Sequence, residues 1–236
     1  MNASELLGLL ARALADNDAD MAMPSRLCRA CVELLGAQSG ALTLSGISDE
    51  RLTVSTSDGV SARIGDLEEM LGEGPGRLAF TEDRIVVTQI DHDRPADAAF
   101  PLFSNLAGSI SGPATSYALP MRVAGRVVGV LSLYVEGDHL ARELDDAQFL
   151  ADAVGMALLG QIDSFDWSAR SQIHQATGMV TAQLGIAPSD ALAILRAHAF
   201  AHSAALGAVA HDVIGRRIVF TYDETHAVQT ERSEEP

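Results

Sequence analysis

The stretch YALPMRVAGRVVGVLSLYVEG, residues 117–137, decides the fold class of this 236-residue chain. Its two arms are rich in β-branched and large apolar residues, and Ala124 and Gly125 lie between them. Such arms around a short glycine-containing turn are typical of an antiparallel β-hairpin. The stretch therefore predicts two long, paired strands.

Strand and helix patterns alternate on the N-terminal side of this hairpin and then cease to alternate. Strand-like runs occur at residues 41–46, 51–58 and 84–90. Helical patterns occur at residues 24–35, 62–71, 75–81 and 98–107. After Glu143 there is no long strand pattern, so the sequence predicts an α+β sheet domain followed by an all-helical module.

The formal net charge of −16 is unevenly distributed along the chain. Residues 1–164 hold 11 arginines against 24 acidic residues, whereas residues 165–220 hold 4 arginines against 3 aspartates. The last 16 residues are acidic again, with 1 arginine against 5 acids. A polyanion would therefore be repelled least by residues 165–220.

The N-terminal run LLGLLARALA, residues 6–15, is apolar, but no positive segment precedes it. Asn2 as N-cap and Glu5 three residues later predict an amphipathic helix within residues 1–20 rather than a leader. No apolar stretch approaches the ~20 residues that span a bilayer. We expect a cytoplasmic protein without membrane contact.

Catalytic and metal-binding motifs have little support in the sequence. There is no nucleophile elbow, no Walker loop and no glycine-rich dinucleotide motif. The pair Cys28 and Cys31 lacks further ligands, so we expect two reduced thiols on the buried side of a helix. His198 and His202 have the spacing of a metal pair but no third ligand, and adjacent acids such as Glu68 and Glu69 are typical of solvated charge. The prediction is a non-enzyme without metal or cofactor.

Residues 21–160 resemble a GAF domain, a ligand-sensing fold with an antiparallel sheet flanked by helices. The resemblance rests on RLCRACVELLGAQSGALTLSG (residues 26–46), LGEGPGRLAF (residues 71–80) and the hairpin, in this order. In GEGPG we expect a turn with glycine at positive φ, after which Pro75 begins a helix. The resemblance implies a sensor of a small molecule or of a partner. GAF domains bind cyclic nucleotides, tetrapyrroles, flavonoids or metals, and some bind no known ligand; the sequence does not choose among them.

Residues 161–220 resemble the ANTAR domain, an all-α three-helix RNA-binding module of bacterial transcription antiterminators. The three helices correspond to IHQATGMVTAQLG (residues 173–185), DALAILRAHAFAH (residues 190–202) and LGAVAHDVIGRRI (residues 206–218). The order GAF then ANTAR is familiar in actinobacteria. The resemblance implies close helix packing at small or apolar positions, namely Ala176, Gly178, Ala199, Leu206 and Ala210.

Candidate RNA-binding residues follow from the same resemblance and from side-chain chemistry. Arginine pairs with phosphate or stacks on unpaired bases, and histidine adds further donors. Thr177 occupies the position of a common lysine in the family. Phe200 is expected in the core, because it continues the apolar helix face of Leu192 and Leu195. The candidate set is Arg170, His174, Thr177, Arg196, His202, Arg216 and Arg217. For each of them, a solvated helix face is the alternative interpretation.

The resemblance implies a signal-responsive antiterminator that holds an RNA stem-loop. The alternative is a protein-interaction module whose helices pair with another regulator and do not bind RNA. We also expect residues 221–236 to form an acidic, disordered tail.

Apolar residues recur every three or four positions from Leu144 through Leu158 and Ile162 to Val180. This register predicts one nearly continuous helix and a homodimer through residues 144–184. A break near Asp163 and Ser164 is the alternative.

Overall fold

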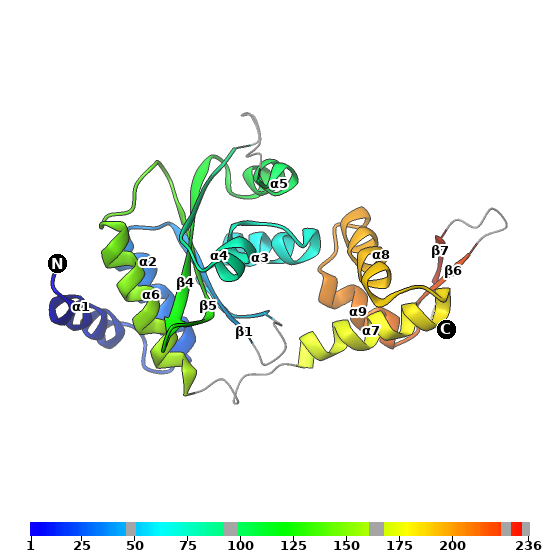
Figure 1. The fold of residues 1–236 in the computed structure, drawn as a ribbon, viewed down its shortest axis with the longest axis horizontal. Coiled ribbons are helices and arrows are strands. Elements are labelled where there is room, and N and C mark those ends of the chain that lie inside the picture. Colours follow the sequence, from blue (N-terminus) through cyan, green and yellow to red (C-terminus); the bar gives the residue numbers. More distant parts are fainter. Residues whose placement is uncertain (46–50, 92–98, 161–167, 223–227, 233–236) are drawn as a thin grey trace. The chain divides into compact units, whose positions relative to one another are not determined.

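The computed structural model describes residues 1–45, 51–91, 99–160, 168–222 and 228–232, and Figure 1 shows the course of the chain. The contacts within it divide the chain into two compact units, Met1–Phe165 and Asp166–Pro236. The helices of the first unit are α1 (Ala3–Asp16), α2 (Met23–Leu35), α3 (Gly59–Leu71), α4 (Pro75–Glu82), α5 (Pro101–Ser111) and α6 (Leu144–Leu159). Its strands are β1 (Ser39–Ser45), β2 (Arg51–Thr56), β3 (Val86–Ile90), β4 (Ala114–Val123) and β5 (Arg126–Val135).

The five strands form one antiparallel sheet in the order β2-β1-β5-β4-β3. The predicted hairpin is confirmed as β4 and β5, which lie in the interior of the sheet. Ala124 and Gly125 form its turn with φ values of 49° and 73°. Two consecutive residues at positive φ match the right-handed twist of the paired strands, which explains the short connection.

Helices cover both faces of the sheet, with α1, α2 and α6 on one side and α3, α4 and α5 on the other (Figure 1). Because side chains alternate along a strand, β5 serves both layers. Val130 and Tyr134 belong to the core under α3, α4 and α5. On the opposite face, α6 approaches β4 so closely that a Cβ at Gly155 would lie 2.9 Å from Met121 Cβ.

The helix cap, the buried cysteines and the glycine-proline turn predicted for the first unit are confirmed. Asn2 and Glu5 form the expected capping box of α1. Cys28 and Cys31 are fully buried free thiols, and burial raises the pKa of Cys28 to about 11 and of Cys31 to about 12. Gly72 ends α3 at a φ of 68°, and Pro75 begins α4.

The expectation of one helix from residue 144 to residue 180 is wrong. Helix α6 ends at Leu159 with Gly160 as its C-cap, and residues 161–167, including the alternative break at Asp163 and Ser164, lie outside the described residues. Four of the five residues of the predicted apolar stripe on α6 are buried, namely Ala147, Ala151, Val154 and Leu158, whereas Leu144 at the start of the helix is 42% exposed. Leu158 is 0% exposed because it packs within its own domain.

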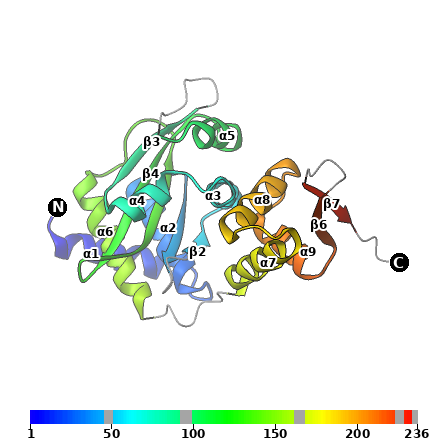
Figure 2. The same ribbon diagram turned by 45° about the vertical axis from the view of Figure 1, so that its right-hand side comes forward.

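The second unit contains α7 (Ser168–Leu184), α8 (Pro188–Ala201), α9 (Leu206–Ile214), β6 (Ile218–Tyr222) and β7 (Val228–Arg232). Helix α7 packs against α8 and α9 (Figure 2). The prediction of disorder after residue 220 is wrong for β7, which pairs with β6 as an antiparallel hairpin. The Phe220 N–H donates to Gln183 Oε1 over 3.1 Å, so β6 is tied to α7.

Candidate sensor pocket and nucleic-acid interface

A pocket of about 270 Å³ lies at one end of the sheet in the first unit. Tyr134 of β5, Val60 of α3, Ser111 at the end of α5 and the acids Asp58 and Glu136 are among its lining residues. Burial raises the pKa of Tyr134, and the negative charges of Glu68 and Asp58 act in the same direction. The phenol therefore stays protonated and can donate or accept a hydrogen bond.

The interior between the sheet and α3, α4 and α5 is filled by apolar side chains, among them Ile64, Phe100 and Phe103. Two buried hydroxyl oxygens on α5 and β4, those of Ser104 and Ser116, have no hydrogen-bond partner within the described residues. Buried polar groups are normally paired, so these two hydroxyls retain hydrogen-bonding capacity within an otherwise apolar interior.

Glu68 joins α3 to the start of α4. Its Oε1 accepts a 2.6 Å hydrogen bond from the Gly76 N–H and a 3.4 Å bond from the Arg77 N–H. A Cβ at Gly74 would lie 2.3 Å from Glu68 Cγ, which explains why glycine occupies this position. Burial raises the pKa of Glu68, although Arg51 and these N–H donors oppose the shift. The interpretation of Glu68 as solvated charge is therefore wrong.

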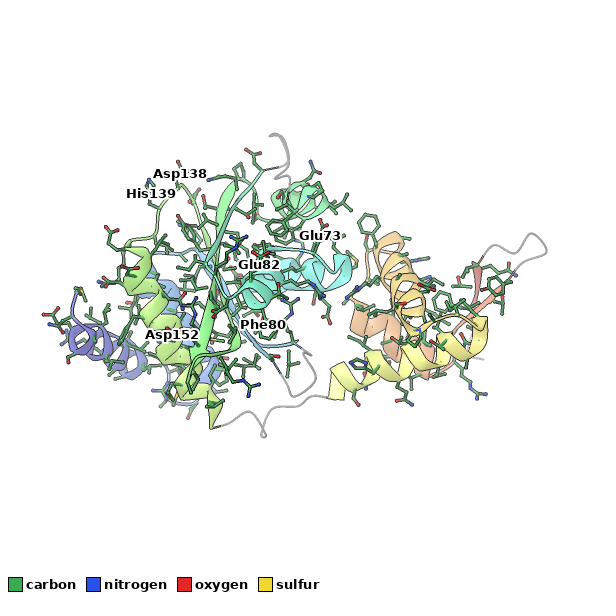
Figure 3. The ribbon with its side chains drawn as sticks, in the orientation of Figure 1. Glu73, Phe80, Glu82, Asp138, His139 and Asp152 are labelled. Atoms are coloured by element: carbon green, nitrogen blue, oxygen red, sulfur yellow. The ribbon has the colours of Figure 1, made fainter. Side chains whose placement is uncertain are left out.

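Glu73 plays the corresponding role for α5. Its Oε1 accepts from the N–H groups of Leu102 (3.3 Å) and Phe103 (3.2 Å) at the start of that helix. Glu73 lies beside α3 in Figure 3. Both carboxylates occupy helix N-termini, where negative charge is favourable. Glu68 and Glu73 thus connect the three helices that cover one face of the sheet.

The raised pKa of Glu68 predicts a specific pH dependence of stability. The folded state holds the Glu68 proton more tightly than the unfolded state, so the contribution of Glu68 to stability falls as pH rises above about 4.5. Glu68→Gln keeps an oxygen acceptor but does not titrate. In urea titrations at several pH values, we expect the native protein to lose stability relative to Glu68→Gln as pH increases. A difference that grows in the opposite direction would contradict the assignment.

A second pocket, of about 460 Å³, lies beside the sheet edge and the segment that leads into α6. Val87, Tyr117, His139, Arg142 and Leu144 are among its lining residues. The Tyr117 hydroxyl donates to the backbone oxygen of Asp138, which fixes this segment against β4. Asp138 and His139 are adjacent on the segment, as Figure 3 shows.

In the second unit, Arg216 and Arg217 directly follow the end of α9. Arg216 is exposed and has a φ of 57°, in the left-handed region that non-glycine residues seldom adopt. Arg217 is half-buried and forms a 2.8 Å ion pair with Asp212. Arg216 is therefore the more accessible of the two for a phosphate.

Near its C-terminal end, α8 contacts β6 through ring packing. His198 packs edge-on against Phe220 with a centroid distance of 5.4 Å, and it stacks on the exposed His202 at 4.1 Å. Strand β6 begins directly after Arg217, so Phe220 links the histidine pair to the segment that carries Arg216 and Arg217.

The remaining predicted contacts lie elsewhere. His174 is exposed on α7, about 13 Å along the helix from Gln183, which contacts β6. Arg170 belongs to the first turn of α7, and its side chain lies outside the described residues. Arg196 is half-buried on α8.

Two sequence assignments need correction. Thr177 is 9% exposed and its hydroxyl donates to the Ile173 carbonyl over 2.7 Å, so it does not present a contact to RNA. Gly178 lies at the surface, where an added Cβ would meet no described atom within 4 Å, so it is not a packing residue. The other packing positions are buried, namely Ala176, Ala199, Leu206 and Ala210.

Phe200 is 49% exposed, so its assignment to the core is wrong. The buried face of α8 consists of Ala191, Leu195 and Ala199. Two of these three are alanines, which the sequence does not distinguish from the alanines on the exposed side. The large apolar side chain of Phe200 therefore led to a wrong prediction of which face of α8 is buried.

A five-stranded antiparallel sheet between two helical layers is the fold of a GAF domain. The chain belongs to the GAF family, whose domain model matches residues 25–158. The ANTAR domain model matches residues 167–214. The predicted domain content and fold class are thereby confirmed.

Solved structures similar to this chain include several GAF domains. One, from a phosphoenolpyruvate-protein phosphotransferase of Coxiella burnetii, is 15% identical, with 72% of this chain and 99% of that chain covered and a TM-score of 0.47. A GAF domain from A. aeolicus in an inactive state is 15% identical, with coverages of 69% and 95% and a TM-score of 0.42. Free methionine-R-sulfoxide reductase from Neisseria meningitidis is 16% identical, with coverages of 69% and 90% and a TM-score of 0.38. No curated protein matches the chain significantly.

Proposed function

We propose that this chain is a signal-responsive transcription antitermination regulator of the actinobacterial type, in which a GAF domain is followed by an ANTAR domain. Its GAF domain senses a small molecule or a protein partner, and its ANTAR domain binds RNA stem-loops of nascent transcripts. The protein acts in the cytoplasm and catalyses no reaction. No single helix within the described segments is long and apolar enough to cross a membrane.

The distribution of charge is the observation that carries this proposal. Residues 165–220 have 4 arginines against 3 aspartates in a chain of net charge −16. Arg216 and Arg217 directly follow the end of α9, and His202 stacks on His198, which contacts Phe220 of β6. A cluster of guanidinium groups suits the phosphates of an RNA hairpin.

The pocket beside Tyr134 supports the sensing role and restricts the size and charge of the ligand. Its volume of about 270 Å³ is near the lower end for small-molecule sites. Asp58 and Glu136 favour a ligand with hydrogen-bond donors or positive charge rather than an anion. We therefore propose a small, polar, neutral or cationic molecule.

The homodimer remains part of the proposal, on a different face of α6. Met156 is 59% exposed and Leu159 is 40% exposed, whereas the predicted stripe is buried from Ala147 to Leu158. Two large apolar side chains at the solvent-facing end of α6 are suited to contact a second copy.

The salt dependence of RNA binding tests the function. We expect the full chain to bind hairpin RNA with an affinity that falls about twentyfold to fortyfold for a rise in salt of about fourfold, if about three phosphates are neutralised. Fluorescence anisotropy with labelled hairpins measures it, and a neutral-backbone hairpin is the control. An affinity that does not respond to salt would favour the alternative, in which the helices pair with another regulator.

A further inference from the structure

The exposed face of α8 carries an aromatic side chain that no role in the core explains. Phe200 is 49% exposed, and Ala193, Ala197 and Ala201 are exposed on the same side of the helix. Apart from Asp190 at its start, α8 contains no acidic residue. Phe200 therefore projects from a flat surface of small side chains.

The helix geometry places Phe200 beside Arg196. Residues four apart lie on the same face of a helix, and long side chains lean toward the helix N-terminus. The Phe200 ring thus leans over the turn that contains Arg196 and Ala197. Arg196 itself is half-buried, and the neighbouring exposed side chains are alanines, so the exposed face of the Phe200 ring is open to a flat partner.

We infer that Phe200 is the stacking platform for an unpaired nucleobase of the RNA loop, and this inference rests on the proposed function. Single-stranded RNA is recognised by bases that stack on aromatic rings and guanidinium planes. Four arginines against three aspartates in residues 165–220 make this unit the part of the acidic chain that repels RNA least. Phosphates would be held by Arg216 and Arg217, and the loop base by Phe200.

The test compares looped and loop-free RNA on full-length protein. The probes are hairpins with a randomised single-stranded loop and the same stem closed by an ethylene-glycol linker. We expect Phe200→Ala to weaken binding of the looped pool by about tenfold or more and to leave binding of the linker-closed stem unchanged. Phe200→Trp should restore the affinity for the loop, because a larger ring stacks equally well.

A spectroscopic measurement separates stacking from a structural effect. Trp167 is the one tryptophan of the chain, so Phe200→Trp in a Trp167→Phe background gives a single reporter. We expect the looped pool to quench its fluorescence and the linker-closed stem to leave it unchanged. Gln175→Trp in the same background, at an exposed position of α7, is the matched control without quenching.

Three results would overturn the inference. In the first, the native protein and Phe200→Ala bind looped RNA equally well, and the looped RNA does not quench the Phe200→Trp variant. RNA binding then stands, but Phe200 has no part in it. If Phe200→Ala changes only the mass measured by light scattering, this face is a protein interface. If the native protein binds neither RNA at low salt, the proposed function fails and the inference fails with it.

Discussion

Replacing Leu158 with aspartate is expected to unfold the GAF domain. Leu158 is 0% exposed on α6, whose neighbouring turn contacts β4 at Met121. The substitution removes a buried leucine and places a carboxylate where no partner is available, at a cost on the order of 5 kcal/mol. Whole domains are stable by about 5–15 kcal/mol, so most or all of that stability is lost. Urea titration followed by circular dichroism measures the change.

Met156→Asp is the matched control on the same helix. Met156 is 59% exposed, so the charge enters water and the free energy of unfolding should change by less than about 1 kcal/mol. If α6 contributes to a homodimer, this variant should instead become monomeric in light scattering while its circular dichroism stays native. A folded, dimeric Leu158→Asp protein would contradict the packing of α6, and a monomeric native protein at micromolar concentration would contradict the dimer.

Much of the first unit could be predicted because its signals are local. The turn at Ala124 and Gly125, the capping box at Asn2 and the glycine-proline start of α4 each require particular residues within a few positions. The continuous helix failed for the opposite reason. A periodic apolar stripe shows that one face of a helix is covered, but it does not show whether the cover is a second subunit or the helix's own sheet. Leu158 is covered by its own domain.

The sites could be predicted less well, because they depend on contacts between distant segments. Glu68 and Glu69 look alike in the sequence, yet only the fold brings the Glu68 carboxylate against the Gly76 N–H. Phe200 was misplaced because alanines fill the core positions of α8. Strand β7 was missed because it lies in the acidic, polar C-terminal segment, which resembles a disordered tail, whereas its pairing with β6 provides the backbone hydrogen bonds.

Removing the two arginines after α9 is expected to abolish most of the RNA binding at low salt. Charged hydrogen bonds contribute about 1.5–3 kcal/mol each, so Arg216→Gly combined with Arg217→Gln should weaken hairpin affinity by at least about a hundredfold if both contact phosphate. The slope of log affinity against log salt should become shallower by about 1–2 units. Fluorescence anisotropy across a salt series measures both quantities.

The backbone at Arg216 makes this experiment independent of folding defects. Arg216 has a φ of 57°, where a non-glycine residue costs on the order of 1 kcal/mol, so Arg216→Gly should raise the free energy of unfolding while it lowers RNA affinity. Asp212→Asn is the complementary control, because it keeps both arginines and releases Arg217 from its 2.8 Å ion pair. We expect this variant to bind the hairpin more tightly. If the double arginine variant is folded and binds as the native protein does, the phosphate contacts lie elsewhere on the ANTAR domain, and the end of α9 is only a solvated helix terminus.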